Sequence, residues 1–175
     1  MISKKTIVVD TNVAVVANGH PQQASLECKR ICVKRLVNIE QGKEKLVLDS
    51  QWQIIKEYTR NLSLKGQSRP GDVFLKWVMD NIKNKEYCEL VNITSLDSDP
   101  TNFHEFPQVP ELSGFDPPDR KFIAVSMAHP NHPPVLQALD SPWWGFKDAL
   151  ERNGVNVEFI CESDIQNLYD QRLER

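Results

Sequence analysis

Short apolar runs alternate along the chain with longer stretches in which apolar residues recur at helical spacing. The apolar runs predict strands over residues 6–9, 46–48, 88–93, 134–139 and 155–160. The helical spacing predicts helices from 13–16 to a stop near Asn18, and at 22–40, 51–62, 72–83, 116–128, 144–153 and 163–173. Strands that alternate with helices are typical of a parallel sheet. The predicted fold class is therefore α/β, a three-layer sandwich in which helices flank a small, mostly parallel sheet.

The helix predicted at 22–40 has apolar residues on two sides. Leu26 and Val33 lie on one face, while Ile31 and Ile39 lie on another. A helix that is apolar on two sides is either sandwiched between other elements or placed at a subunit contact. This pattern, together with the family resemblance described below, leads us to expect a homodimer.

The connections between elements carry their own signals. Asp49 or Ser50 can cap the helix at 51–62, and a stretch with glycine and proline connects 65–71. Residues 94–115 contain three prolines and little periodicity. A loop of that length inside a compact domain is usually functional or partly disordered.

The composition is that of a globular chain. Its 175 residues, 40% of them hydrophobic and 26% charged, fit one compact domain over 1–175. No apolar run reaches the roughly 18 residues of a membrane span, so no membrane association is expected. The first residues imitate an export signal, but Asp10 and Asn12 interrupt its apolar part. We therefore expect a cytoplasmic protein that begins with a strand.

Cysteine and charge refine this description. The four cysteines are too few for a disulfide scaffold, and Cys28 and Cys32, one helical turn apart, are interpreted as small core residues. Residues 1–85 carry 15 Lys and Arg against 8 Asp and Glu, whereas residues 86–175 carry 6 against 16. A basic half can attract a polyanion and an acidic half can hold divalent cations; an unevenly charged solvated surface is the alternative.

Several carboxylates fall where an open parallel sheet collects its ligands. Asp10 ends the first predicted strand, Asp140 ends the strand at 134–139, and Glu57 lies inside the helix after the second strand. Asp116 and Asp119 begin the helix before that strand. With no cationic residue adjacent in sequence, Asp10 and Asp140 need an external counter-ion. Hard oxygen ligands suit Mg²⁺ or Mn²⁺, which support hydrolysis of a phosphodiester.

Each carboxylate also has a structural interpretation. Asp116 and Asp119 could be a helix cap and its partner, and Asp140, which is followed by a Ser-Pro pair, could cap a helix. Glu57 could be an exposed helix residue in a salt bridge. Asp10 is the hardest to explain in this way, because it directly follows a buried strand.

The order of these motifs resembles the PIN domain family of metal-dependent nucleases. The resemblance covers residues 6–160 and is carried by Asp10-Thr11-Asn12-Val13, Glu57 within 52–58, Asp119 within 119–128, and Ala138-Leu-Asp140. It implies a small parallel sheet and acidic residues that bind Mg²⁺ or Mn²⁺ and cut RNA. Many members are toxins of toxin-antitoxin pairs, which implies an antitoxin protein as a partner.

The resemblance also implies roles for single residues. Metal ligation and catalysis fall to Asp10, Glu57, Asp119 and Asp140, supported by Thr11 or Asn12, and Asp116 replaces or assists Asp119. Two features depart from the pattern. Pro142 and Trp143 stand where many members have a further acidic residue, which weakens a second metal, and 94–115 is longer than in compact toxins.

Substrate contacts have separate candidates. Basic residues that could bind phosphate and aromatic residues that could stack on unpaired bases are Lys56, Arg60, Arg120, Lys121, Trp143 and Trp144. A solvated surface is the alternative for each basic residue, and core burial is the better expectation for at least one tryptophan.

The leading hypothesis is a Mg²⁺- or Mn²⁺-dependent endoribonuclease that hydrolyses single-stranded RNA, as a toxin or in defence or RNA processing. The alternative is a catalytically inactive PIN-like module that binds or scaffolds. A phosphatase of the haloacid dehalogenase type also begins with a strand and an Asp. It requires a second Asp two positions later, where this chain has Asn12.

Overall fold

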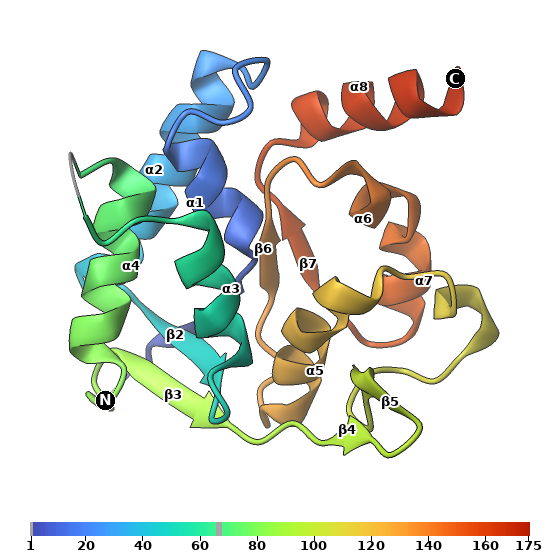
Figure 1. Cartoon of the computed structure of the whole chain (residues 1–175), viewed down its shortest axis with the longest axis horizontal. Coiled ribbons are helices and arrows are strands. Elements are labelled where there is room, and N and C mark those ends of the chain that lie inside the picture. Colours follow the sequence, from blue (N-terminus) through green and yellow to red (C-terminus); the bar gives the residue numbers. More distant parts are fainter. Residues whose placement is uncertain (1, 66–67) are drawn as a thin grey trace.

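A five-stranded parallel sheet forms the centre of the molecule (Figure 1). The computed structural model describes residues 2–65 and 68–175. The strands, in the order β3-β2-β1-β6-β7, are β3 Cys88–Val91, β2 Glu44–Asp49, β1 Lys5–Val9, β6 Val135–Gln137 and β7 Val157–Phe159. Every neighbouring pair is parallel. The predicted α/β fold class is confirmed, and each of the five predicted strands is present.

Helices flank this sheet in a three-layer arrangement (Figure 1). They are α1 Thr11–Ala17, α2 Leu26–Glu40, α3 Gln53–Asn61, α4 Pro70–Asn81, α5 Arg120–Ala128, α6 Ser141–Gly145, α7 Lys147–Arg152 and α8 Glu162–Leu173. The single helix predicted at 144–153 is two helices, because the chain leaves helical geometry at Phe146, where ψ is 0°. Of the connection predicted at 65–71, residues 66 and 67 lie outside the described residues, and α4 already begins at Pro70.

The α2 helix is shorter than predicted. Its first turn is capped by Ser25, whose hydroxyl accepts a hydrogen bond from the Cys28 N–H at 3.0 Å, so residues 22–25 precede the helix. One face is buried against α1 and α4, and Ile31 and Val33 on the other side are half-buried. Leu26 is 63% exposed. The second apolar side is therefore only partly covered within one chain.

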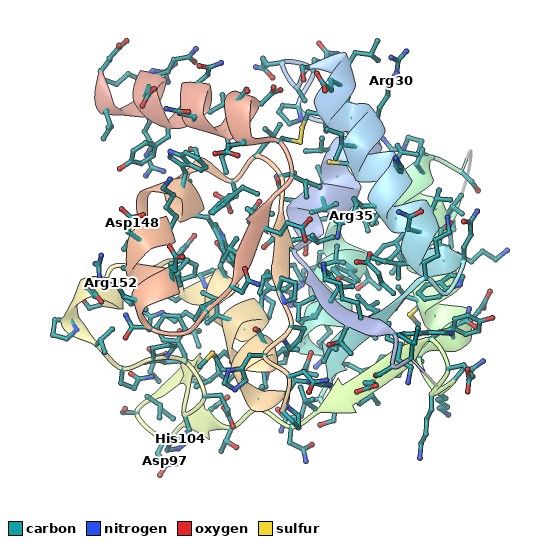
Figure 2. All side chains as sticks on the ribbon, turned by 180° about the vertical axis from the view of Figure 1, so that it is seen from behind. Arg30, Arg35, Asp97, His104, Asp148 and Arg152 are labelled. Atoms are coloured by element: carbon teal, nitrogen blue, oxygen red, sulfur yellow. A yellow bond between two sulfur atoms is a disulfide. The ribbon has the colours of Figure 1, made fainter. Side chains whose placement is uncertain are left out.

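Arg35 ties α2 to two strands of the sheet, and Figure 2 labels it in the view from behind. Its guanidinium binds Glu44 on β2, at 3.3 Å, and Glu158 on β7. Lys5 on β1 lies between the same two carboxylates, at 3.9 and 3.8 Å. This ion network joins α2 to β2, β1 and the edge strand β7.

The prediction of an irregular loop at 94–115 is wrong. This segment forms a hairpin of β4 Ser95–Leu96 and β5 Asp99–Phe103, followed by a short 3-10 helix, η1 Pro110–Leu112. Phe106 and Phe115 are buried, although their wide spacing shows no period in the sequence. The Arg120 guanidinium donates to the Phe115 carbonyl at 3.0 and 3.2 Å and to the Ser113 carbonyl at 3.0 Å. The segment is thus packed and anchored to α5.

The interpretation of Cys28 as a simple core residue is also wrong, because Cys28 forms a disulfide with Cys161. Cys32 is buried as predicted. Within residues 2–65 and 68–175, no helix is both long and apolar enough to cross a membrane.

The strand order fixes where a ligand can bind. The chain builds the sheet outward from β1 in one direction and then returns to β6 on its other side, so the order reverses between β1 and β6. Open α/β sheets bind ligands outside the carboxyl ends of the strands at such a point. The Asp10 N–H donates to the Leu136 carbonyl at 3.1 Å, which fixes Asp10 to the end of β6.

Candidate metal centre

Asp10 lies at the reversal point with one satisfied and one unsatisfied oxygen. Its side chain is buried, and Oδ1 accepts a hydrogen bond from the Asn12 N–H at 2.8 Å. Oδ2 is also buried, and no described residue donates to it. Burial, followed by the charges of Asp119 and Asp140, raises the pKa of Asp10 well above its ordinary value. The position therefore favours a cation beside Oδ2.

Glu57 lies near Asp10 because α3 packs against the end of β1. The Tyr58 hydroxyl donates to the Val9 carbonyl at 2.5 Å and holds the helix against the end of β1. Thr11 Oγ1 then donates to Glu57 Oε1 at 2.7 Å. Thr11 contacts Glu57 through its hydroxyl, whereas Asn12 contacts Asp10 only through its backbone N–H. The Asn12 side chain instead accepts a hydrogen bond from the Leu139 N–H at 2.6 Å, next to Asp140.

Lys121 is a partner of Glu57 that the sequence did not reveal. Its ammonium pairs with Glu57 Oε2 and donates to the Pro118 carbonyl. Glu57 is thus in a salt bridge, as its structural interpretation allowed, although its side chain is half-buried and not exposed. A signal was present: the sequence after Asp119 is apolar on almost all sides of α5, so a lysine there must be buried and needs a counter-charge.

Asp119 and Asp140 complete the group. The Trp143 indole N–H donates to Asp119 Oδ2 at 3.0 Å. Burial, followed by the charge of Asp140, raises the pKa of Asp119 to about 7. Burial also raises the pKa of Asp140, against the opposing effects of a hydrogen bond with Asp119 and the charge of Arg172 on α8. These carboxylates therefore perturb one another within one partly buried site.

The helix-capping interpretations do not account for these two side chains. Asp140 precedes α6 and Asp119 precedes α5, but neither makes a side-chain capping hydrogen bond with the part of the chain that the structure describes. Asp116 is exposed at the start of a short 3-10 helix, η2 Pro117–Asp119, and its charge adds to the rise in both pKa values. It lies at the rim of the site and Asp119 lies inside it.

Three residues proposed to contact RNA are buried instead, and their assignment is corrected. Arg120 anchors the hairpin segment, Lys121 pairs with Glu57, and Trp143 is fully buried against Phe115 with a ring distance of 4.9 Å. Trp144 is half-buried, with Lys147 Nζ 4.3 Å from its ring centre. Trp143 therefore presents no face to a base, and Lys147 covers one face of the Trp144 ring.

Lys56 and Arg60 remain exposed and lie beside the site. They line a groove of about 430 Å³ between α3 and the hairpin of β4 and β5, together with Gln51, Gln53, Glu57, Ser95, Pro100 and Lys121. The groove joins basic residues at its rim to a site carboxylate. The segment predicted as a loop supplies its opposite wall.

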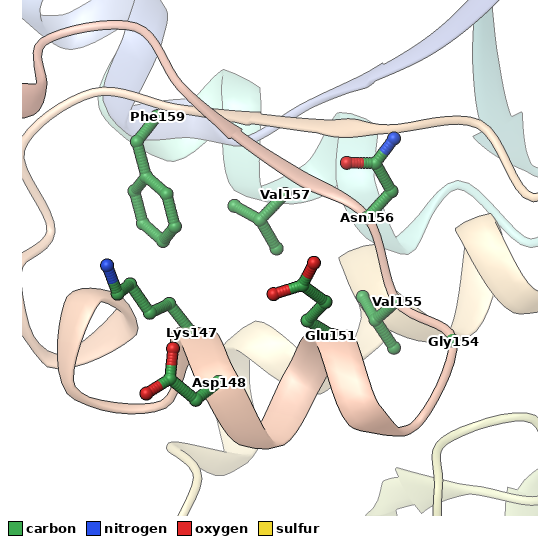
Figure 3. Close-up of a pocket in the computed structure, with 8 residues that line it drawn as sticks. All are labelled: Lys147, Asp148, Glu151, Gly154, Val155, Asn156, Val157 and Phe159. Atoms are coloured by element: carbon green, nitrogen blue, oxygen red, sulfur yellow. The ribbon is translucent and has the colours of Figure 1, made fainter.

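A second cavity, of about 530 Å³, lies between α7 and β7 (Figure 3). Lys147, Asp148 and Glu151 line its helix side and Val157 and Phe159 its strand side. None of the carboxylates discussed above lines this cavity, so it is separate from the candidate metal centre.

The chemistry of the ligand atoms fits a hard divalent cation, but the distances between these atoms are too long for one ion. It offers carboxylate oxygens only, including the buried Oδ2 of Asp10, as Mg²⁺ and Mn²⁺ prefer. Over the described ranges, however, the one group of three potential ligand residues whose ligand atoms lie within 4.8 Å of one another is a cysteine cluster. A bound cation would have to draw the carboxylates inward, and Glu57 away from Lys121.

No protein-family model, no curated protein and no solved structure matches this chain. Its function is therefore inferred from the geometry and chemistry of the site.

Proposed function

We propose that the protein is a Mg²⁺- or Mn²⁺-dependent endoribonuclease of the PIN domain type that hydrolyses single-stranded RNA. One observation carries this proposal. Asp10 is buried at the reversal point of a parallel sheet, among carboxylates that raise one another's pKa, and no described residue binds its second oxygen. Such a group is expected to recruit a cation, because like charges in a buried site destabilise each other.

The residues divide into ligands and the groups that orient them. Asp10, Glu57, Asp119 and Asp140 would hold the ion. When bound, the divalent cation supplies charge that activates water and offsets charge on the attacked phosphate. Asn12 fixes Asp10 and Trp143 fixes Asp119 through the hydrogen bonds described above.

The groove between α3 and the β4–β5 hairpin is the proposed substrate path. Lys56 and Arg60 on its rim would bind phosphates of the RNA backbone. The proposed path does not include base stacking, because Trp143 is buried and Trp144 is covered on one face.

The cellular role is proposed as well. We propose a cytoplasmic nuclease that acts as the toxin of a toxin-antitoxin pair, in defence or in RNA processing. The half-covered side of α2, with Leu26 exposed, supports a homodimer. An antitoxin protein is the partner that a toxin role would require.

One observation favours an inactive binding module as a second candidate. Lys121 already neutralises Glu57, so one of the four carboxylates is satisfied without a metal. A site fixed in that state would keep the fold and the basic groove but lack a complete ligand set.

A labelled single-stranded RNA panel with Mn²⁺ separates the two candidates. Hydrolysis by activated water leaves 5′-phosphate and 3′-hydroxyl ends, which mass spectrometry reads directly. Asp10→Asn and Asp140→Asn should each lower cleavage on the order of a thousandfold, a loss equivalent to several kcal/mol. Asp148→Asn is the matched control, because Asp148 is exposed on α7 (Figure 2) and should retain full activity.

Two results would overturn the nuclease proposal. Cyclic-phosphate ends, or cleavage that survives both a chelator and Asp10→Asn, would exclude the metal mechanism. Absence of cleavage on every RNA and DNA tested would favour the binding module.

A further inference from the structure

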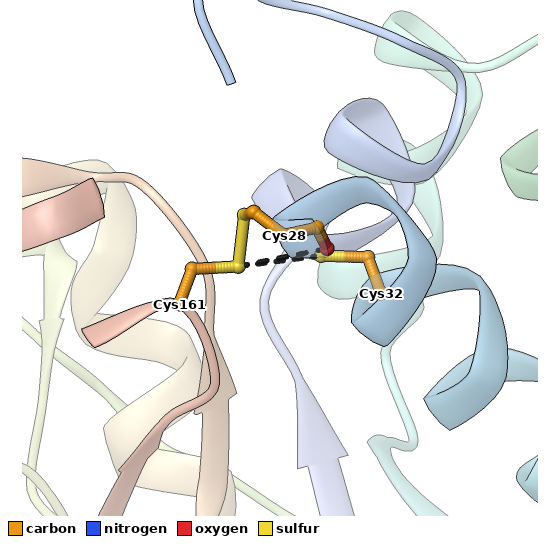
Figure 4. A group of neighbouring side chains, drawn as sticks. All are labelled: Cys28, Cys32 and Cys161. Carbon is orange, nitrogen blue, oxygen red and sulfur yellow. Dashed lines mark hydrogen bonds between the residues drawn. A yellow bond between two sulfur atoms is a disulfide. The ribbon is translucent and has the colours of Figure 1, made fainter. Parts of the chain in front are cut away.

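Three cysteines from two distant parts of the sequence meet at the start of α2 (Figure 4). Cys28 and Cys32 lie one turn apart on α2, and Cys161 lies between β7 and α8. Cys28 and Cys161 form the disulfide, and the Cys32 sulfur lies 3.9 Å from the Cys161 sulfur. The three sulfur atoms lie within 4.8 Å of one another, and all three side chains are buried. The proposed nuclease chemistry uses none of them.

A third buried sulfur has no part in a structural disulfide, whereas three thiolates suit a tetrahedral zinc site. Tetrahedral zinc with Zn–S bonds of about 2.3 Å places neighbouring sulfurs about 3.8 Å apart. The sulfur atoms of Cys32 and Cys161 already have this separation. When the disulfide is reduced, the Cys28 and Cys161 sulfurs move apart to a non-bonded distance, which approaches the same value.

The cluster also has room for a fourth ligand. A cavity of about 150 Å³ is lined by Cys28 and Cys161, together with Ser25 and Asp164 among others. The Asp164 carboxylate, at the start of α8, accepts hydrogen bonds from the Ser25 N–H at 2.8 Å and the Ser25 hydroxyl at 3.0 Å. This carboxylate lies outside the group of ligand atoms within 4.8 Å of one another, so a water in the cavity is the fourth ligand that needs the least rearrangement.

We propose that Cys28, Cys32 and Cys161 bind one Zn²⁺ ion in the reduced protein, and that the disulfide is the oxidised form of the same site. A dithiol reductant gives two electrons and two protons to the Cys28–Cys161 bond and itself becomes a disulfide. Zn²⁺ then replaces the protons of the three thiols and releases three protons. Both forms fasten α2 to the start of α8, so this link persists in a reducing compartment such as the cytoplasm expected from the sequence.

Disulfide shuffling within the cluster is the less favoured reading. Burial, followed by the charge of Asp164, raises the pKa of Cys32 to about 12. A raised thiol pKa lowers the fraction of thiolate, which is the form that attacks a disulfide.

Cobalt substitution tests the proposal without any nuclease assay. The full chain is reduced with a phosphine in the absence of oxygen, freed of reductant, and titrated with Co²⁺, which reports sulfur ligands by a thiolate-to-cobalt charge-transfer band. The reduced protein should gain this band at one Co²⁺ per chain, and Zn²⁺ should abolish it. The oxidised protein should show no band.

Variants assign the ligands. Cys32→Ala and Cys32→Ser should each lose the band, yet both should still form the Cys28–Cys161 disulfide on oxidation, measured by mass. Cys88→Ala is the matched control, since Cys88 is equally buried but lies outside the cluster on β3. Asp10→Asn should keep the band, which separates this site from the carboxylates. A folded, reduced wild-type protein without the band, or a band that survives in both Cys32 variants, would overturn the proposal.

Discussion

Asp10 and Asp49 end neighbouring parallel strands, and both are buried. The two oxygens of Asp49 accept hydrogen bonds from the Gln53 and Ile54 N–H groups, both at 2.9 Å, so its carboxylate is fully used as the cap of α3. Asp10 caps α1 with one oxygen, and none of residues 2–65 and 68–175 donates to the other. A structural aspartate thus has a hydrogen-bond donor for its second oxygen, and a candidate metal ligand has none.

The difference has a local cause. After Asp49 the chain makes an extra turn, with Trp52 in the left-handed region at φ 64°, before α3 begins, so the first N–H groups of the helix surround the carboxylate. After Asp10 the helix α1 begins at once. Its N-terminus receives only one oxygen, and the charges of Asp119 and Asp140 act on the carboxylate.

The largest expected effect on stability concerns Glu57. Like Asp49, Glu57 has a partner for its charge within the protein, because it pairs with Lys121. Lys121→Met leaves a largely buried carboxylate without its counter-charge, and metal-free stability should fall by about 3 kcal/mol. Mn²⁺ should restore more stability in this variant than in the wild type, because it replaces the lost charge. Chemical denaturation with and without Mn²⁺ measures both the loss of stability and its recovery. Lys56→Met, at an exposed neighbouring position, should change neither.

The two aspartates should respond in opposite directions to the same substitution. Asp49→Asn replaces an acceptor by a donor that faces a helix N–H, and stability should fall by about 2 kcal/mol. Asp10→Asn removes a charge that its neighbours oppose, so the metal-free protein should be as stable as the wild type or more so. A large loss of stability in Asp10→Asn without metal would make Asp10 structural as well.

Much of this arrangement was predictable from the sequence, because strand ends and helix starts are local features. The apolar runs before Asp10 and Asp140 located both carboxylates, and Asp49 was one of two candidate caps, with Ser50, for the helix that follows. The pairing of Lys121 with Glu57 was not predictable in this way, since it joins residues 64 positions apart through the packing of α5 on α3. The same holds for Cys28 and Cys161, which are separated by 133 positions.

The hairpin at residues 95–103 shows a further limit of periodicity. Its strands are short, and its buried aromatics follow in irregular segments, so no repeat appears in a window of the usual length. Burial of Trp143 likewise depends on Phe115, which arrives from that segment. The stacking role predicted for Trp143 is wrong for this reason, whereas the expectation that at least one tryptophan is buried in the core is confirmed.

A smaller effect is expected at Trp143, which orients Asp119. Trp143→Phe removes the indole donor and keeps an aromatic ring in the core, so Mn²⁺ affinity should fall about tenfold. Calorimetric titration gives this value directly. Trp144→Phe is the matched control, because the structure shows no hydrogen bond from Trp144 to any described ligand carboxylate. Equal losses in the two variants would indicate a general packing effect.

The smallest effect is the pH dependence of metal-free stability. Asp119 has a pKa of about 7 in the fold against 3.8 ordinarily, so the folded protein binds the proton more tightly. This contribution is complete below about pH 4 and is lost as pH rises through about 7. Stability should therefore fall by about 1 kcal/mol between pH 6 and 7, and Asp119→Asn should make the curve less steep over this interval. A rise over this interval would contradict the assigned direction.

Calorimetric titration of Mn²⁺ into the wild type, Asp10→Asn and Asp49→Asn tests the central claim most directly. We expect the wild type and Asp49→Asn to bind Mn²⁺ with affinities within about threefold of each other, a difference below 1 kcal/mol. Asp10→Asn should lose at least about tenfold in affinity, because its free oxygen is replaced by an amide. Equal Mn²⁺ affinity in wild type and Asp10→Asn would show that the group at the reversal point of the sheet is not a metal site.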